Sequence, residues 1–114
     1  MIDNSVVKDV RRKDKTVIVD AVGDIDLSRS QAFQQSLLVV LNEKPDVLIV
    51  NLAGVPYMDS SGVASLVKLL SRSRKGGFKL ALVGLQDRVR SVFEITRLDN
   101  VFEIYPTEEE AMAS

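Results

Sequence analysis

The chain has 114 residues, of which 46% are hydrophobic and 27% are charged, as expected of one compact globular domain with no room for a second. Fifteen Lys and Arg residues against 16 Asp and Glu residues give a net charge of -1, which excludes a broad positive field for a nucleic-acid backbone. The chain has no Cys and no His, which excludes disulfide bonds, zinc sites built from these residues and Ser-His-Asp catalysis.

The same sequence lacks the patterns of several other protein classes. Its apolar runs are far shorter than the roughly 20 residues that cross a bilayer, and residues 1–4 lack the basic-then-apolar pattern of a secretion signal. The Gly-Lys-Ser/Thr phosphate loop, the Gly-x-Gly-x-x-Gly motif and the Gly-x-Ser-x-Gly elbow are also missing. We therefore expect a cytoplasmic protein without membrane insertion, direct nucleic-acid binding, a metal or a cofactor.

The first elements in the chain are predicted to be a hairpin and a helix. Valine-rich segments at 6–10 and 17–21 indicate two strands, and the basic residues of 11–15 are interpreted as the solvated tip between them. From 28 to about 43, apolar residues recur at helical spacing, and Pro45 prevents the helix from continuing.

A buried strand and a second helix follow. Residues 47–52 are apolar on both alternating faces, which is typical of a strand in the middle of a sheet. Residues 60–75 carry one apolar stripe, made by Val63, Leu66, Val67 and Leu70. Asp59 or Ser60 is the predicted N-cap of this helix, whose free amides and dipole would also accept an anion such as phosphate.

The rest of the chain continues the alternation, with a strand at 78–83, a helix at 87–96 and a strand at 101–105. A short final helix begins at the predicted capping box of Thr107 and Glu110. Helices between strands imply parallel crossovers, while the initial hairpin adds an antiparallel edge. The sequence therefore predicts an α/β fold with a mixed, mostly parallel sheet and about four helices.

Two polar loops are expected to lie close together in this fold. The loop at 55–61 follows the buried strand, and Gly23-Asp24-Ile25-Asp26 follows an earlier extended segment. Loops at the carboxyl ends of parallel strands gather at one edge of the sheet, where binding sites form. By itself, Asp-Ser-Ser-Gly before a helix is most simply a cap.

The segment at 51–62 (Asn-Leu-Ala-Gly-Val-Pro-Tyr-Met-Asp-Ser-Ser-Gly) resembles the signature of STAS domains, specifically the small bacterial anti-sigma factor antagonists. Three further segments resemble the family in the same order: the loop at 23–26, Gly76-Gly77, and 89–98 with 101–104. The resemblance covers nearly the whole chain and implies a single STAS domain over 1–114, with a core of about 5–112. Val63-Ala64 stand where many such antagonists have Leu-Gly, which bears on the partner that is recognised and not on the fold.

The resemblance also implies a function. The unphosphorylated protein is expected to bind an anti-sigma factor with serine kinase activity and so free a sigma factor. Phosphorylation of Ser60, the first serine after the motif aspartate, would end this binding, and a serine phosphatase would restore it. Ser61 is the second candidate hydroxyl. In this interpretation the protein is not an enzyme, and it is monomeric when free.

The predicted partner-binding residues lie in the two loops, and some have a simpler structural explanation. Turn chemistry explains Asp24 and Asp26 equally well, and packing beneath the loop is expected for at least one of Tyr57 and Met58. A basic helix side with Lys68, Arg72, Arg74 and Lys75 either meets an acidic partner or is a solvated face. The complete predicted set is Asp24, Asp26, Tyr57, Met58, Asp59, Ser60, Ser61 and Gly62.

Three other functions compete with this one. One is a STAS scaffold, or a subunit of a signalling or lipid-transport assembly, in which Ser60 is merely part of the cap. A phosphoaspartate receiver is disfavoured because it needs a Lys near the end of a late strand, and no Lys follows Lys79. A metal-dependent hydrolase using Asp59 or Asp24 is disfavoured because the chain has no His and no recognisable ligand spacing.

Overall fold

A computed structural model of the protein describes residues 3–114, so the first two residues of the predicted domain lie outside the described part. Within that part, five strands and four α-helices confirm the predicted α/β class. The elements in chain order are β1 (Val7–Lys13), β2 (Thr16–Val22), α1 (Leu27–Leu41), β3 (Val47–Gly54), α2 (Ser60–Gly76), β4 (Lys79–Val83), α3 (Asp87–Ile95), the short 3-10 helix η1 (Leu98–Asn100), β5 (Glu103–Tyr105) and α4 (Glu108–Ala113).

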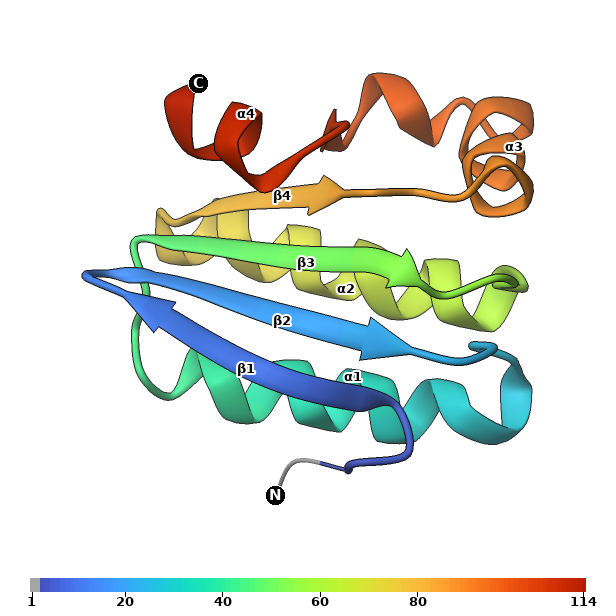
Figure 1. Cartoon of the computed structure of the whole chain (residues 1–114), viewed down its shortest axis with the longest axis horizontal. Coiled ribbons are helices and arrows are strands. Elements are labelled where there is room, and N and C mark those ends of the chain that lie inside the picture. Colours follow the sequence, from blue (N-terminus) through green and yellow to red (C-terminus); the bar gives the residue numbers. More distant parts are fainter. Residues whose placement is uncertain (1–2) are drawn as a thin grey trace.

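The strands form one mixed sheet in the order β1-β2-β3-β4-β5 (Figure 1). β1 pairs with β2 in the antiparallel sense, and β2 to β5 are parallel to one another, as predicted from the alternation of strands and helices. β3 lies in the middle of the sheet, where Leu48, Ile49 and Val50 are buried. The apolar run at 47–52 is therefore explained by helices on both faces of this strand.

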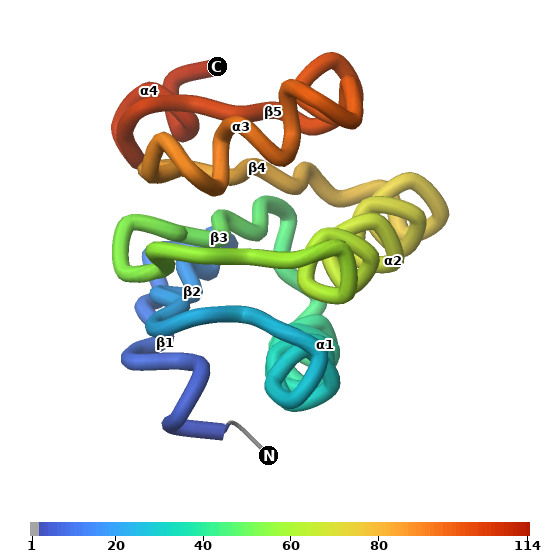
Figure 2. The backbone as a smooth tube through the Cα atoms, turned by 90° about the vertical axis from the view of Figure 1, so that its right-hand side faces the viewer, coloured from blue at the N-terminus to red at the C-terminus, as the bar shows by residue number. Residues whose placement is uncertain are grey.

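The helices cover the two faces unequally. α1 and α2 lie side by side on one face of the sheet, and α4 lies on the opposite face (Figure 2). The larger core, between the sheet and the helix pair, includes Phe33, Leu37 and Leu66. A smaller cluster on the other face joins Ile18, Ile49, Ala81 and Val83 to Ala111 of α4.

The basic segment of the first hairpin differs from its prediction. The turn between β1 and β2 contains only Asp14 and Lys15, while Arg11 and Arg12 belong to strand β1. Arg11 forms ion pairs with Asp20 and Glu108, and Arg12 pairs with Glu43. The placement of both arginines at the hairpin tip was therefore wrong, although their side chains stay partly exposed to solvent. Their partners lie on the neighbouring strand, just after α1 and on α4.

The sheet brings the carboxyl ends of β2, β3 and β4 to one edge, at the right of Figure 1. The connections into α1, α2 and α3 all begin there, whereas α1 and α2 end at the opposite edge. The two polar loops singled out from the sequence, at 23–26 and 55–59, therefore lie at the same end of the molecule.

Candidate functional site

The two polar loops are joined by backbone hydrogen bonds, which confirms their predicted proximity. Ile25 and Met58 form an isolated parallel bridge, with the Ile25 N–H donating to the Tyr57 carbonyl at 2.9 Å. The Asp59 N–H donates in turn to the Ile25 carbonyl at 3.1 Å. The loops thus continue the pairing of β2 with β3 by one further step and present a single surface.

Asp59 is the N-cap of α2, which resolves the choice between Asp59 and Ser60. Its Oδ1 accepts hydrogen bonds from the backbone N–H groups of Ser61 at 2.9 Å and Gly62 at 3.4 Å. Its Oδ2 accepts a hydrogen bond from the backbone N–H of Leu27 at 3.2 Å, across the two loops. The hydrogen bond from the Ser61 hydroxyl, followed by those from the three amides, outweighs partial burial and lowers the pKa of Asp59.

Asp26 has the equivalent place at the start of α1. Its Oδ1 accepts hydrogen bonds from the backbone N–H of Ser28 at 3.0 Å and from the Ser28 hydroxyl at 2.7 Å. The structural explanation of Asp26 as a cap is therefore correct. Asp24 is exposed, and no side-chain hydrogen bond of its own occurs within residues 3–114. Contact of either carboxylate with a partner stays a prediction.

The two adjacent serines differ in the hydrogen bonding and exposure of their hydroxyl groups. The Ser61 hydroxyl donates to Asp59 Oδ1 at 2.5 Å and is only partly exposed. Ser60 is exposed at the first position of α2, and its hydroxyl makes no hydrogen bond with the rest of the described chain, residues 3–114. Ser60 therefore presents the more accessible hydroxyl.

Tyr57 and Met58, both in the predicted contact set, have different surroundings. Tyr57 is 36% exposed, and its ring centroid lies 5.4 Å from the guanidinium carbon of Arg88 at the start of α3. Met58 is only 1% exposed and forms the bridge to Ile25, as expected if at least one of the two side chains packs beneath the loop. Its contact with a partner stays a prediction.

Gly62 is also buried, and it allows α2 to approach the loops closely. A Cβ atom at this position would lie 2.6 Å from Met58 Cγ and 2.8 Å from Ile25 Cγ2. Contact of Gly62 with a partner stays a prediction. Its contribution to the site is to let α2 pack directly on both loops.

Leu27 is a surface residue of the site that the sequence prediction missed. It is the first residue of α1 and is 78% exposed, although its backbone N–H is bound to Asp59. The sequence did contain a signal. Leu27 is an apolar residue directly after Asp26, and its spacing puts it on a different side of the helix from Phe33 and Leu37. Exposed apolar side chains beside polar groups are typical of protein contact surfaces.

Neither a cluster of metal-ligating side chains nor a membrane-spanning helix occurs in the described residues. Across residues 3–114, no group of three or more Asp and Glu side chains lies close enough together to hold a metal ion. No helix in the same part of the chain is long and apolar enough to cross a bilayer. What distinguishes this edge of the sheet is an exposed serine hydroxyl within a small, partly apolar surface.

The fold and the site together define a class of small domains. Its members have an α/β fold with four helices, and a capped helix that begins with serine follows the central strand. Residues 7–111 match the STAS domain family, and the chain belongs to this family. It is 35% identical over 88 residues to the anti-sigma-B factor antagonist of Listeria monocytogenes, covering 77% of both chains.

Two further relatives match over almost the full length. The anti-sigma-F factor antagonist RsfA of Mycobacterium tuberculosis is 26% identical over 115 residues, which cover 99% of this chain and 90% of that protein. The crystal structure of an anti-sigma factor antagonist from Mycobacterium paratuberculosis superposes with a TM-score of 0.83 at 26% identity, covering 91% of this chain and 88% of that one.

Proposed function

We propose that this protein is an anti-sigma factor antagonist whose binding to its anti-sigma factor is switched by phosphorylation of Ser60. The names of its relatives support the antagonist role. The observation that carries the switch is the contrast between the two hydroxyls: that of Ser60 is exposed and unbonded within residues 3–114, while that of Ser61 is held by Asp59. A kinase active site can approach the first without breaking any contact of the domain.

In the proposed reaction, the Ser60 Oγ attacks the γ-phosphorus of ATP bound to the partner kinase. The new Oγ–P bond replaces the bond between that phosphorus and the β,γ-bridging oxygen, so ADP leaves and a base of the kinase takes the hydroxyl proton. This protein supplies only the nucleophile and is a substrate and binding module with no chemistry of its own. A serine phosphatase hydrolyses the phosphoserine and restores the binding form.

The domain tolerates the phosphate because of where Ser60 lies. The group adds about -1.5 to -2 charge at neutral pH, at the positive end of the dipole of α2. Ser60 is exposed, so the phosphate displaces no packed side chain. We therefore expect phosphorylation to leave the fold of the domain nearly unchanged.

Phosphorylation weakens binding of the partner because the partner's surface must cover Ser60. Leu27 and Tyr57 are the exposed apolar side chains of the joined loops, and Ser60 belongs to the same surface. Covering them would require the phosphate to lose its hydration without a compensating partner. A loss of about 4 kcal/mol weakens binding roughly a thousandfold, which is sufficient for a switch.

The test is binding of purified variants to the anti-sigma factor of the same organism, measured by calorimetry. Ser60→Ala should retain binding and Ser60→Asp should lose it, whereas Ser61→Asp, which removes the hydrogen bond to Asp59, serves as the neighbouring-charge control. In a phosphorylation assay with ATP, Ser60→Ala should accept no phosphate and Ser61→Ala should accept it. Equal binding by Ser60→Ala and Ser60→Asp would instead identify the protein as a constitutive scaffold.

A further inference from the structure

Helices α1 and α2 carry basic side chains and no acidic ones, in contrast to the rest of the molecule. Neither the 15 residues of α1 nor the 17 residues of α2 include an Asp or a Glu, although the whole chain has a net charge of -1. Their basic residues are Arg29, Lys68, Arg72, Arg74 and Lys75. The acidic side chains lie outside the two helices: Asp26 and Asp59 cap their N-termini, and three consecutive glutamates begin α4.

A groove runs between these two helices over most of their length. It consists of three hollows of about 350, 360 and 580 Å³. The first and second share Gln34 and Lys68, and the second and third share Arg72 and Lys75, so the hollows lie next to one another in a row. The groove begins beside Ser61 and ends at the opposite edge of the sheet. A 17-residue helix such as α2 is about 25 Å long, which is enough to hold roughly eight residues of an extended chain.

The cations of this groove have no carboxylate partners in the described structure. Lys68, Arg72 and Lys75 all line it, and within residues 3–114 the side-chain ion pairs involve only Arg11, Arg12 and Lys79. Arg74 lies outside the groove and lines a hollow beside β5 instead. The basic side predicted from the sequence is therefore divided into three groove residues and one that faces elsewhere.

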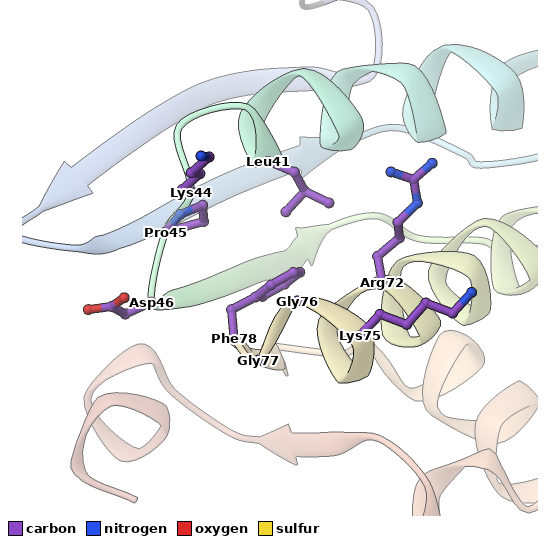
Figure 3. Close-up of a pocket in the computed structure, with 9 residues that line it drawn as sticks. All are labelled: Leu41, Lys44, Pro45, Asp46, Arg72, Lys75, Gly76, Gly77 and Phe78. Carbon is purple, nitrogen blue, oxygen red and sulfur yellow. The ribbon is translucent and has the colours of Figure 1, made fainter.

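The acidic residues nearest to the groove do not neutralise it. Asp46 borders its far end, but the carboxylate points away from Arg72 and Lys75 (Figure 3). Glu43 follows α1 and is bound by the guanidinium of Arg12. At the other end, the carboxylate of Asp59 lies beside Ser61 and accepts hydrogen bonds from the Ser61 hydroxyl and the Gly62 N–H. Lys68, Arg72 and Lys75 are therefore not paired with a carboxylate along the groove.

The remaining lining is suited to a polypeptide. Gln31, Gln34 and Gln35 of α1 line the first hollow and can both donate to and accept from a peptide backbone. At the far end, Phe78 points toward Leu41, and Arg72 extends from α2 toward α1 beside them, to their right in Figure 3. This end combines an apolar floor with basic walls.

We propose that the groove between α1 and α2 is a docking site for an acidic segment of a partner protein, with one apolar side chain seated on Leu41 and Phe78. Aspartate and glutamate side chains of that segment pair with Lys68, Arg72 and Lys75. A nucleic-acid duplex or a lipid bilayer is a wide polyanion, which the acidic elements of the molecule would repel. Neither has an amide backbone with which the glutamines could form hydrogen bonds. The inference goes beyond the proposed function, because docking here uses no atom of Ser60.

The test begins with a phage-displayed library of random peptides of about 12 residues, selected on the full-length protein at low ionic strength. We expect enrichment of peptides in which several Asp or Glu residues flank an apolar one. A selected peptide, labelled with fluorescein, is then titrated against wild type and two variants. K68Q/R72Q/K75Q removes the groove charges, and K8Q/K13Q/R74Q removes three exposed charges elsewhere, so the two variants have the same net charge.

The groove variant should weaken binding by about tenfold or more, and the control variant by less than about twofold. Both change only exposed side chains, and thermal unfolding of each verifies that the fold is intact. Absence of an acidic consensus, or equal loss in the two variants, would overturn the proposal. Tighter groove-dependent binding of phosphatidylglycerol vesicles or of single-stranded RNA than of the peptide would overturn it in favour of a polyanion surface.

Discussion

The carboxylate of Asp59 accepts a hydrogen bond from the backbone N–H of Leu27 at 3.2 Å, across 32 positions of sequence. The same carboxylate caps α2 through Ser61 and Gly62. One side chain thus fixes the start of one helix relative to the start of the other. In the proposed switch, Asp59 is a positioning residue that holds Ser60 in register with the exposed Leu27.

Replacing Asp59 by Ala should lower the midpoint of thermal unfolding by several degrees, because both the cap and the link between the loops are lost. Asp26→Ala is the matched control, since it removes a helix cap without a bond to the other loop. Hydrogen exchange of the Leu27 amide should accelerate in Asp59→Ala and stay slow in Asp26→Ala. Equal exchange rates in the two variants would contradict the linking role of Asp59.

The contribution of Asp59 should also depend on pH in a defined direction. Its pKa in the folded protein is lowered from the ordinary value of 3.8, chiefly by the hydrogen bond from the Ser61 hydroxyl. A lowered folded pKa gives stability that is present above the unfolded pKa and is lost as the pH falls through the folded pKa. The difference in unfolding free energy between wild type and Asp59→Asn should therefore be constant near neutral pH and shrink below pH 3.8. A difference unchanged in acid would show that the charge is not involved.

Gly62→Ala should destabilise the protein by about 1–3 kcal/mol, although alanine normally favours a helix. The new methyl group would overlap Met58 Cγ and Ile25 Cγ2. Gly76→Ala, near the other end of α2, meets only the ring of Phe78 at 3.3 Å and should cost less than about 0.5 kcal/mol. Urea unfolding of the two variants measures the loss of unfolding free energy in each. Equal losses would contradict the close packing of Gly62 on the loops.

Glu108→Ala should weaken the attachment of α4 to the sheet. The Glu108 carboxylate accepts hydrogen bonds from the Arg11 guanidinium and from Asn51 Nδ2, and these contacts lower its pKa. We expect a loss of about 1 kcal/mol, a modest value because Arg11 is partly exposed. The amides of α4 should exchange faster. Glu109→Ala, an exposed neighbour, is the control and should change neither quantity.

The arrangement of elements followed from the sequence because each has a clear local pattern. The apolar run at 47–52 and the helical stripe at 60–75 predicted β3 and α2 within two residues of their observed ends. The final strand was less accurate: it begins at Glu103 and not at Val101, because η1 occupies 98–100 and the N–H groups of Val101 and Phe102 bond to the Leu98 carbonyl.

What local patterns missed depends on contacts between distant residues. Met58 lies in a loop, where no period indicates which side chains turn inward, and only its bridge to Ile25 settles the matter. Arg11 looked like part of a turn because its partner Glu108 is 97 positions away. The exposure of Leu27 likewise follows from how α1 packs and not from its neighbours in sequence.

The most direct test of the central claim is peptide mass spectrometry of the protein recovered from its own cells under several growth and stress conditions. The account predicts an added mass of about 80 Da on the peptide that contains Ser60, localised to that residue and absent from a Ser60→Ala strain. Fragment ions that place the phosphate on Ser61, or an unmodified peptide under every condition, would contradict it.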